Sequence, residues 1–551
     1  MIFPLAGEDR QGERWLAPDL RAIGRAHSGV PTVAHRVQLF ESLDAILLAA
    51  LILLVLARKL NVPYPTLLAA AGIGFAALPF APKITVEPHL ALALFIAPAL
   101  LHAAYHTSPR ALRRHWFPLL SLAVFAVLVT AAAVALVGVT MGGLPLAAAF
   151  ALGAIVAPPD AAASEAVLGE VGIPRRGLLL LQGESLLNDA TALLLFGLAV
   201  AFATYSDTPG TPLALAAAVP GGIVFGALVS WAYLRIAPLF AGTLGASLAD
   251  FAVTFGIWLL AERLHISPVL AVVTFGMIVS QRRPIGQPAR DRLQGAAVWS
   301  ATVLVLNIIA FALMGLQSRD VLVGLPTAER WPAIGFAAAV LATVLVTRVA
   351  WVFLVRFIEG VIANRYAPSW LPTPPPWNAS LILSWSGMRG LLTLATAFAL
   401  PRSVPGRDLI VLAAFGVVIG TLMLQGLTLG PLIRRLNLGA DPGLANEIAP
   451  ARKRLIEAGL AVLPARAGEA ADALRFRYGA AGKVTAEADD PQATSEFDEL
   501  HLEMIACQRV VLHQMRDKGE VAEDVYRRLQ EELDWAEVDA RAYGDNILTA
   551  T

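Results

Sequence analysis

The sequence predicts an all-α polytopic membrane protein of about thirteen transmembrane helices, followed by a helical cytoplasmic tail. Apolar residues make up 57% of the 551-residue chain and charged residues only 15%, with a mean hydropathy of +0.65. A soluble domain carries roughly 25% charged residues. The apolar residues are grouped in runs that can cross about 30 Å of hydrocarbon as helices. We therefore expect a polar N-terminal segment (1–41), a transmembrane domain (42–438) and a cytoplasmic tail (439–551).

Thirteen runs are long and apolar enough to be interpreted as spans. They are 42–57, 66–81, 88–105, 117–141, 144–168, 177–203, 212–239, 245–263, 266–281, 297–317, 332–358, 378–400 and 408–433. Alternate loops are rich in arginine and lysine, which mark the cytoplasmic side of a membrane. These residues are Arg58, Lys59, Arg110, Arg113, Arg114, Arg175, Arg176, Arg282, Arg283, Arg290, Arg292, Arg356, Arg365, Arg434 and Arg435. The pattern predicts a cytoplasmic C-terminus and, with an odd number of spans, an N-terminus outside.

Two spans contain helix-breaking residues near their middle. The fifth carries Pro158 and Pro159, and the twelfth carries Ser386, Gly387 and Gly390. Prolines and glycine-serine pairs interrupt or kink helices. Secondary transporters place broken helices at matching positions of two inverted repeats, where the free helix ends face an ion. The two spans are seven apart, which fits two six-span repeats of opposite orientation after one extra helix.

Two carboxylates lie within apolar runs, where a charge is costly unless it pairs, binds an ion or carries a proton. Asp160 follows the two prolines, and Asp189 lies in the sixth span. Ser185 lies one helical turn before Asp189, and Asn188 is its neighbour. Together these four side chains would form an oxygen-rich site of the kind that hard cations such as Na⁺ prefer. The alternative is a polar network that only packs helices together.

Arg389 is a permanent positive charge within the twelfth span, so it needs a counter-charge or a cage of carbonyl oxygens. Glu184, in the sixth span, faces away from Asp189 and is a plausible partner for it. We expect an Arg389–Glu184 ion pair that braces the broken helices, with a direct role of Arg389 in transport as the alternative. Arg348 also lies within a predicted span, but near enough to its cytoplasmic end to reach the surface, and it is left without a role.

The tail is acidic, with 13 Lys and Arg against 22 Asp and Glu over residues 440–551. Residues 498–520 and 527–543 have apolar positions at helical spacing and should form amphipathic helices, while 483–495 is typical of a linker. Regulation, dimer stabilisation or a solvated appendage would each fit this composition. Cys507 is the only cysteine, so no intrachain disulfide is possible. No phosphate loop, dinucleotide fingerprint or zinc-ligand spacing occurs, and we expect no enzyme activity, no cofactor and no nucleic acid.

Several segments together resemble bacterial Na⁺/H⁺ antiporters of the NhaP type, in the monovalent cation:proton antiporter-1 family. The most specific are GESLLNDATALLLFGLAVA and LSWSGMRGLLTLATAFALP, and AIVAPPDAAA, LNVPYPTLLAAAGIGFA, WLLAERLHISPVLAVVTFGMIVS, LNIIAFALMGLQ and LQGLTLGPLIRRL also match. The resemblance covers residues 42–438 and implies an inverted-repeat fold of thirteen helices that is usually a homodimer. It implies that Asp189 alternately holds Na⁺ and H⁺, that Asp160 and Asn188 support that site, and that Arg389 is the charge partner at the crossing helices.

The sequence departs from the family in two places. Pro159 and Ala162 stand where many relatives have threonine and valine around the aspartate. In the third span, some members bring an acidic side chain to the ion, whereas this chain has His102, Ala103 and His106. A histidine such as His102 can be a packing residue or a proton sensor, and the absence of the acid leaves the ion coordination and the choice between Na⁺ and K⁺ open.

The function expected from these observations is antiport of a monovalent cation, in the first place Na⁺, against H⁺ across the inner membrane of a bacterium, with a role in pH homeostasis. Na⁺ would bind Asp189 and Asp160 as a transported substrate, and Li⁺ or K⁺ could replace it. With Asn188 beside Asp189, the resemblance implies one-for-one, electroneutral exchange. The alternatives are a K⁺/H⁺ antiporter of the same fold, an ion channel, or a transport-inactive sensor of cations or pH.

Overall fold

Helices form all the regular secondary structure in the described part of the chain. The computed structural model describes residues 33–60, 62–78, 87–160, 164, 175–204, 211–243, 245–282, 289–323, 330–366, 374–436, 457, 472, 476, 496–518 and 523–541. The first helices are α2 (Val33–Leu60), α3 (Tyr64–Ala76), α4 (Pro88–Ala91), η1 (Leu92–Ile96), α5 (Ala97–His106), α6 (Pro109–Arg114), α7 (Trp116–Leu120), η2 (Ser121–Phe125), α8 (Ala126–Thr140) and α9 (Leu146–Val156). Those that follow are α11 (Arg175–Thr204), α12 (Thr211–Ile236), η3 (Ala237–Phe240), α13 (Gly245–Arg263), α14 (Pro268–Arg282), α15 (Ala289–Leu316), α16 (Ser318–Val323), α17 (Arg330–Tyr366), α18 (Trp377–Trp385), α19 (Leu391–Ala399), α20 (Arg407–Leu436), α23 (Glu496–Asp517) and α24 (Glu523–Arg541).

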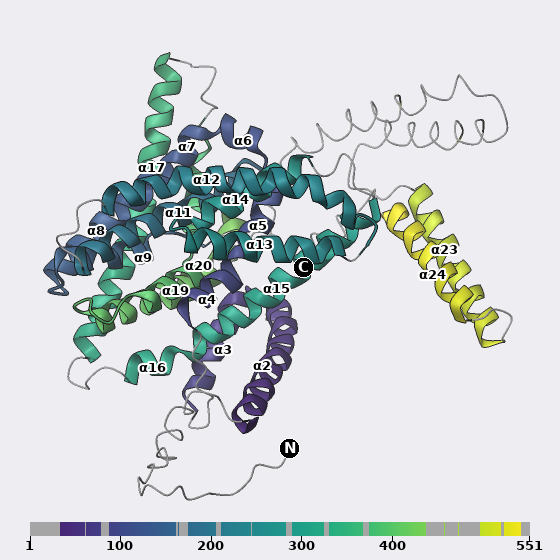
Figure 1. Ribbon diagram of the computed structural model, residues 1–551, viewed down its shortest axis with the longest axis horizontal. Helices are drawn as coiled ribbons and strands as arrows, with labels where there is room; N and C mark the ends of the chain where they lie inside the picture. The colour runs from purple at the N-terminus through teal and green to yellow at the C-terminus, as the bar shows by residue number, and fades with distance from the viewer. Residues whose placement is uncertain are drawn as a thin grey trace, which may run out of the picture.

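The helices of the expected transmembrane domain pack into one bundle (Figure 1). Each of the thirteen predicted spans overlaps a helix, which confirms the all-α fold class. Among the described residues, eight helices are long and apolar enough to cross a membrane, and Tyr64–Ala76, Leu146–Val156 and Pro268–Arg282 are shorter apolar helices. The number thirteen therefore stays a prediction. The first described helix, α2, begins at Val33, before residue 42, and the division into 1–41, 42–438 and 439–551 stays a prediction.

The two predicted breaks are confirmed. Helix α9 ends at Val156, and the chain then runs through Pro158 and Pro159 without helical structure. Both prolines lack the N–H that would continue the helix. Likewise, α18 ends at Trp385 and α19 begins only at Leu391. In both spans the break lies deep inside the bundle, so its backbone groups must find partners in the protein rather than in water.

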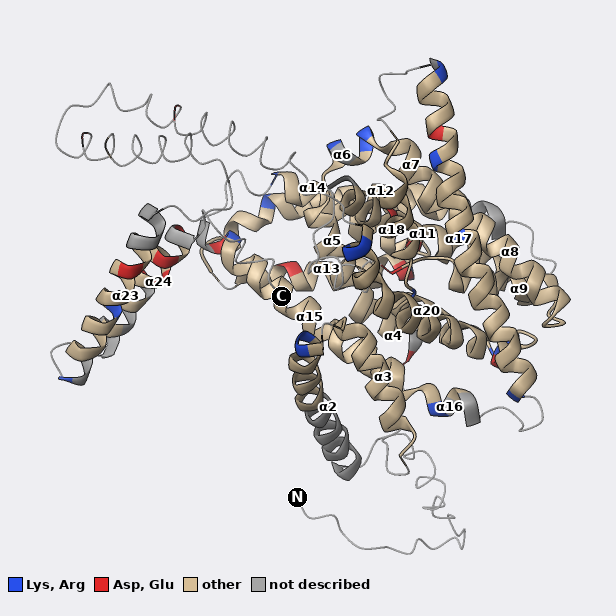
Figure 2. Ribbon diagram, turned by 180° about the vertical axis from the view of Figure 1, so that it is seen from behind, with Lys and Arg blue, Asp and Glu red and all other residues tan. Residues whose placement is uncertain are grey.

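Small residues allow the helices beside the first break to approach closely. A Cβ atom on Gly153 of α9 would lie 2.4 Å from the carbonyl oxygen of Ala131 on α8, so no larger residue fits there. Packing of this kind is typical of helices in lipid, where close backbone contact takes the place of a hydrophobic driving force. The outer surface is correspondingly apolar: side chains such as Ile52, Leu228 and Phe357 are exposed on the bundle. Figure 2 shows few charged residues along most of the ribbon within the bundle.

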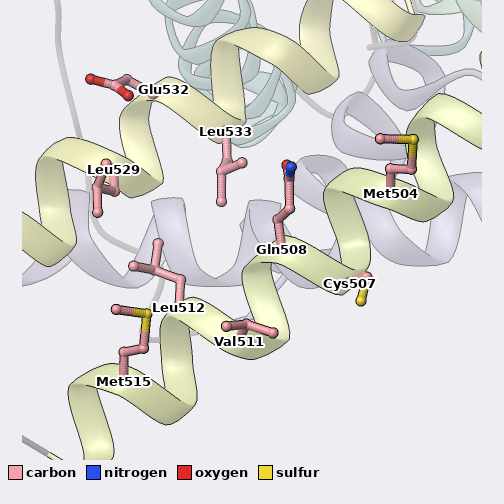
Figure 3. Close-up of a pocket in the computed structure, with 9 residues that line it drawn as sticks. All are labelled: Met504, Cys507, Gln508, Val511, Leu512, Met515, Leu529, Glu532 and Leu533. Carbon is pink, nitrogen blue, oxygen red and sulfur yellow. The ribbon is translucent and has the colours of Figure 1, made fainter. Parts of the chain in front are cut away.

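The tail contains two antiparallel helices, α23 and α24, apart from the bundle in both views (Figures 1 and 2). Arg509 of α23 forms ion pairs with Asp534 and Glu537 of α24, and Tyr526 contacts His513 through a 2.8 Å hydrogen bond. Both predicted amphipathic helices are confirmed, while the predicted linker 483–495 lies outside the described residues. Figure 3 shows an apolar groove along one side of this pair, lined mainly by methionine, leucine and valine.

Candidate ion site at the crossing of two broken helices

The two breaks meet and hold each other through backbone hydrogen bonds. The N–H of Asp160 donates to the carbonyl oxygen of Met388 at 2.7 Å. One turn further, the Ser164 hydroxyl donates to the carbonyl oxygen of Ser386. Each break therefore supplies hydrogen-bond partners for the other, which satisfies backbone groups that water cannot reach. The crossing places residues from two distant parts of the sequence next to each other.

The carboxylate of Asp160 lies at the N-terminus of α19. Its Oδ2 accepts a hydrogen bond from the Leu391 N–H at 3.3 Å. A helix N-terminus carries free N–H groups and a partial positive charge, so it favours a carboxylate. Gly390 makes this approach possible, because a Cβ atom there would lie 1.6 Å from the same Oδ2. The glycine in the SGMRG segment is thus required for space at the Asp160 side chain.

Asn188 and Asp189 face this crossing from α11. The Asn188 Nδ2 donates to the carbonyl oxygen of Pro159 at 3.1 Å, which ties α11 to the first break. The Asn188 Oδ1 is buried and accepts no hydrogen bond from any described residue. Asp189 follows Asn188 in α11 and is 8% exposed. Ser185 is half-buried, and no hydrogen bond to another described residue brings it into this group.

Arg389 is held by a cage of carbonyl oxygens. Its Nε and Nη2 donate to Val156 and Ala157 at 3.1 Å each, and its Nη1 donates to Gly387. The first two acceptors are the carbonyls at the C-terminal end of α9, where the partial charge is negative. The side chain is 1% exposed. Three carbonyl oxygens therefore hold the Arg389 guanidinium, and the prediction of an Arg389–Glu184 ion pair is wrong.

Glu184 pairs with Arg348 instead. The Arg348 Nη2 donates to Glu184 Oε2 at 2.8 Å, and Nη1 donates to Oε1, which gives a two-bond ion pair. Both side chains are almost completely buried. The interpretation that Arg348 reaches the surface is therefore also wrong. The predicted span was too short, since α17 runs over 37 residues and Arg348 lies at its midpoint.

Two further polar side chains near the second break were missed by the sequence analysis. Thr421 of α20 accepts a hydrogen bond from the Arg389 backbone N–H at 3.0 Å. Thr393 of α19 is 1% exposed, and its hydroxyl has no hydrogen-bond partner among the described residues. Threonine is common within helices, where its hydroxyl usually bonds to the preceding turn, so neither residue stands out in the sequence.

The chemistry of these side chains suits a small cation or a proton. It combines the carboxylates of Asp160 and Asp189 with the amide oxygen of Asn188 in a site that water reaches poorly. Two carboxylates at such a site repel each other when both are ionised, and a bound cation or proton removes that repulsion. Oxygen ligands of this kind suit hard monovalent cations.

Comparisons with known proteins identify the family of the chain. Residues 46–435 match the family model described as sodium/hydrogen exchanger, transmembrane. An uncharacterized Na⁺/H⁺ exchanger of Mycobacterium tuberculosis is 29% identical over 530 residues, which covers 90% of this chain and 95% of the relative. The Na⁺/H⁺ antiporter ApNhaP of Aphanothece halophytica is 30% identical, covering 69% of this chain and 71% of the relative.

A sodium, potassium, lithium and rubidium/H⁺ antiporter of Bacillus pumilus is 29% identical, covering 76% of this chain and 66% of its own length. The solved structure of the sodium proton antiporter MjNhaP1 from Methanocaldococcus jannaschii has the same fold, with a TM-score of 0.58 and 18% identity. That match covers 73% of this chain and 99% of the antiporter. The family model spans well over half of the chain, and the resemblance seen in the sequence is confirmed. The chain belongs to the family of transmembrane sodium/hydrogen exchangers.

Proposed function

We propose that the protein is a secondary active antiporter in which a monovalent cation, first of all Na⁺, and H⁺ compete for Asp189. The single observation that carries this proposal is the buried Asp189 carboxylate in α11, next to Asn188, whose side chain bonds to the first of the two broken helices. A carboxylate in that position needs a cation or a proton, and the surrounding oxygens can serve either one. Family membership supports cation:proton antiport by a multi-pass membrane protein rather than an enzyme.

Competition couples the two fluxes. When Asp189 is protonated, its charge is neutral and the cation has lost its main ligand. When the cation is bound, the carboxylate holds no proton. Only these two neutralised forms would move the site across the membrane, because an ionised carboxylate without a partner is costly in a low-dielectric environment. One cation therefore crosses for each counter-moving proton.

Asp160 is proposed to assist rather than to exchange protons itself. Its carboxylate already accepts the Leu391 N–H at the start of α19, and that contact favours the ionised form. It would therefore remain a fixed negative ligand, while Asp189 alternates between its partners. Asn188 contributes an amide oxygen and no charge, so only one carboxylate changes state. The exchange is accordingly electroneutral.

Several finer properties belong to this proposal. The protein is expected to be a homodimer in the inner membrane of a bacterium, with its C-terminus in the cytoplasm, as the arginine-rich loops indicate. Na⁺ is the leading substrate, although the Bacillus pumilus relative is named for potassium, lithium and rubidium as well, so K⁺/H⁺ exchange is the second candidate. A channel or a transport-inactive sensor is the alternative of another class.

Reconstituted proteoliposomes test the proposal. Internal pH is followed after addition of Na⁺, K⁺ and Li⁺ in turn, with wild type and with Asp189→Asn. The amide keeps the shape of the side chain but cannot exchange a proton, so cation-driven proton movement should vanish while the protein remains folded. Normal proton movement in this variant would refute the assignment of Asp189. Cation flux that moves no proton in the opposite direction would instead indicate a channel.

Imposed membrane potential tests the stoichiometry. A potential of 100 mV acting on one net charge amounts to about 2.3 kcal/mol, so an electrogenic exchanger would respond clearly. For this protein the steady-state rate should be nearly independent of potential. A strong dependence would show that a second carboxylate, with Asp160 the first to examine, also exchanges protons.

A further inference from the structure

The groove on the tail hairpin is an apolar surface that no described helix of the bundle packs along. It lies between α23 and α24, has a volume of about 500 Å³, and is drawn in Figure 3. The polar members of its lining are Gln508 and Glu532. Met504 and Val511, on α23, are 61% and 48% exposed. A contiguous apolar strip of this kind marks an interaction surface.

The hairpin buries too little apolar surface to be stable by itself. In its described part, the buried apolar side chains are Ile505, Leu512 and Tyr526. The ion pairs of Arg509 with α24 lie at the surface, where such pairs contribute little. Most of the stability of a helix in a protein comes from packing its apolar face against another element. We therefore expect the groove to be covered in the folded protein.

The groove-lining positions of α23 are symmetric about a point near the middle of the helix. Cys507 and Met504 lie on one side of the point between residues 507 and 508, and Gln508 and Val511 lie at the same spacings on the other side. That point is about one residue from the midpoint of α23 (Glu496–Asp517). If a second α23 crosses the first in the antiparallel direction, Met504 of each copy meets Val511 of the other. The same surface thus fits itself, as a two-fold interface requires.

The charges of α23 also favour an antiparallel pair. Residues 496–506 contain four acidic residues and no lysine or arginine, whereas residues 507–518 contain three basic residues and one acidic residue. In a parallel pair, the two acidic halves would lie side by side and repel each other. In an antiparallel pair, each acidic half faces the basic half of the other copy. A membrane surface is the poorer occupant, because anionic lipids repel a tail that is acidic overall.

We propose that two copies of this chain pair through the groove, with their α23 helices antiparallel and the two-fold axis between residues 507 and 508. The four helices would form a small bundle in which each copy covers Met504, Val511 and Met515 of the other. Near the axis, the two Gln508 amides lie opposite each other, and each can donate and accept a hydrogen bond. A polar pair inside an apolar seam fixes the register of the helices. The inference goes beyond antiport, since it does not depend on which ion is carried.

Cys507, the only cysteine of the chain, tests this arrangement directly. At a rise of about 1.5 Å per residue, the two Cys507 residues would be offset by about 1.5 Å along the helix axes. Packed helices lie about 8–10 Å apart, so the two thiols come within reach of a disulfide. The full-length protein in membranes is treated with a mild oxidant and separated on a non-reducing gel. A cross-linked dimer is expected, and Cys507→Ser should abolish it.

Moving the cysteine tests the direction of the helices. In the Cys507→Ser background, Met504→Cys and Val511→Cys should each cross-link poorly alone, because identical positions would lie about 10 Å apart along the axes. When the two variants are co-expressed with tags of different size, they should cross-link to each other. Val510→Cys is the matched control, because Val510 is similarly exposed but does not line the groove. Equal cross-linking of each position to itself would indicate chance collision or a parallel pair, and would overturn the proposal.

A charge in the seam provides the second test. Val511→Glu should lower the yield of the Cys507 cross-link about tenfold, because it places a carboxylate in an apolar contact, whereas Val510→Glu should leave it unchanged. A dimer held only through the membrane helices would keep the same yield in both variants, and this result would refute the tail interface.

Maleimide labelling of Cys507 distinguishes the other possible occupants. An absent cross-link with a protected thiol would mean that another part of the chain covers the groove, and an absent cross-link with a reactive thiol would mean that nothing does. Either result contradicts the proposal. A protein that cross-links as expected but exchanges no ions would fail the proposed function and keep this interface.

Discussion

Two buried arginines in this bundle are stabilised in different ways. Arg348 lies at the midpoint of the unbroken helix α17 and forms a two-bond ion pair with Glu184. Arg389 lies in the break between α18 and α19 and donates to three backbone carbonyls, two of them at the end of α9. In an unbroken helix the carbonyls are already occupied, so a buried cation needs a carboxylate. A broken helix offers carbonyls of its own, and the cation can be held without a side-chain anion.

The contrast matters for the ion site. If an acidic side chain neutralised Arg389, another negative charge would lie next to Asp160 and Asp189 and would compete for the transported cation. Because backbone carbonyls hold Arg389, its guanidinium is satisfied without a hydrogen bond to an acidic side chain of the described residues. The Glu184–Arg348 ion pair, in turn, links α11 to α17.

The largest expected effect comes from breaking the Glu184–Arg348 pair. Either Glu184→Ala or Arg348→Ala leaves the other charge buried without a partner, which should cost about 3 to 5 kcal/mol of stability. Thermal unfolding in detergent measures the loss. The double variant should lose much less than the sum of the two single changes. Additive losses would show that the two side chains do not act as a pair.

Gly390→Ala should damage transport more than folding. The new Cβ atom would collide with Asp160 Oδ2 and displace that carboxylate from the start of α19. A shift of about 1 Å at a functional group can lower a rate about a hundredfold. Gly335→Ala is a matched control, since a Cβ atom there meets no other atom within 4 Å. Equal exchange rates in the two glycine variants would argue that the position of Asp160 is unimportant.

The comparison of the two arginines can be sharpened with a second double-variant cycle. Arg389→Met and Glu184→Ala share no hydrogen bond, so their effects on thermal stability should be close to additive, with a coupling near 1 kcal/mol from charge alone. That value should be clearly smaller than the coupling between Glu184 and Arg348. Arg389→Lys should also destabilise, because one ammonium cannot reach three carbonyls in the geometry of a guanidinium. A coupling energy as large as that between Glu184 and Arg348 would show that Arg389 and Glu184 interact directly.

The smallest expected effect concerns the support of Arg389 by α20. Thr421→Val removes the acceptor of the Arg389 N–H and keeps the side chain nearly the same size. A buried donor left without its partner costs about 1 to 3 kcal/mol, so melting temperature should fall modestly. Thr140→Val serves as a control, because its exposed hydroxyl donates to the carbonyl oxygen of Leu136 in its own helix, away from the crossing. The same decrease in melting temperature in both variants would show that the Thr421 hydroxyl does not support the crossing.

Much of this fold follows from local sequence. Long apolar runs specify helices, and Pro158, Pro159, Gly387 and Gly390 specify where two of them break, since those residues act on their own backbone. Asp160 and Asp189 could also be named as candidate site residues from the sequence, because a carboxylate is costly inside a membrane.

Partner choice between helices was not predictable from spacing alone. Glu184 could be placed on a face of α11, but which arginine it meets depends on how α11, α17 and the second break are rotated and shifted relative to one another. The spacing of residues along one helix contains no information on how that helix is rotated or shifted against its neighbours. The prediction for Arg348 was wrong for a related reason. The apolar run is shorter than α17, so Arg348 was placed too near the end of its helix. Nothing in the sequence around His102 indicates its neighbours; in the folded protein it lines the same cavity as Asp250 and Asp291.

The central claim, competition of cation and proton for Asp189, is tested most directly by the apparent affinity for Na⁺ as a function of pH. Initial exchange rates are measured in proteoliposomes over a range of Na⁺ concentrations at each pH. If a proton excludes the cation, the KM for Na⁺ should rise about tenfold for each unit of acidification at low pH, equivalent to about 1.4 kcal/mol, while the maximal rate changes little. A KM that stays constant while the maximal rate falls with acidification would contradict competition at Asp189.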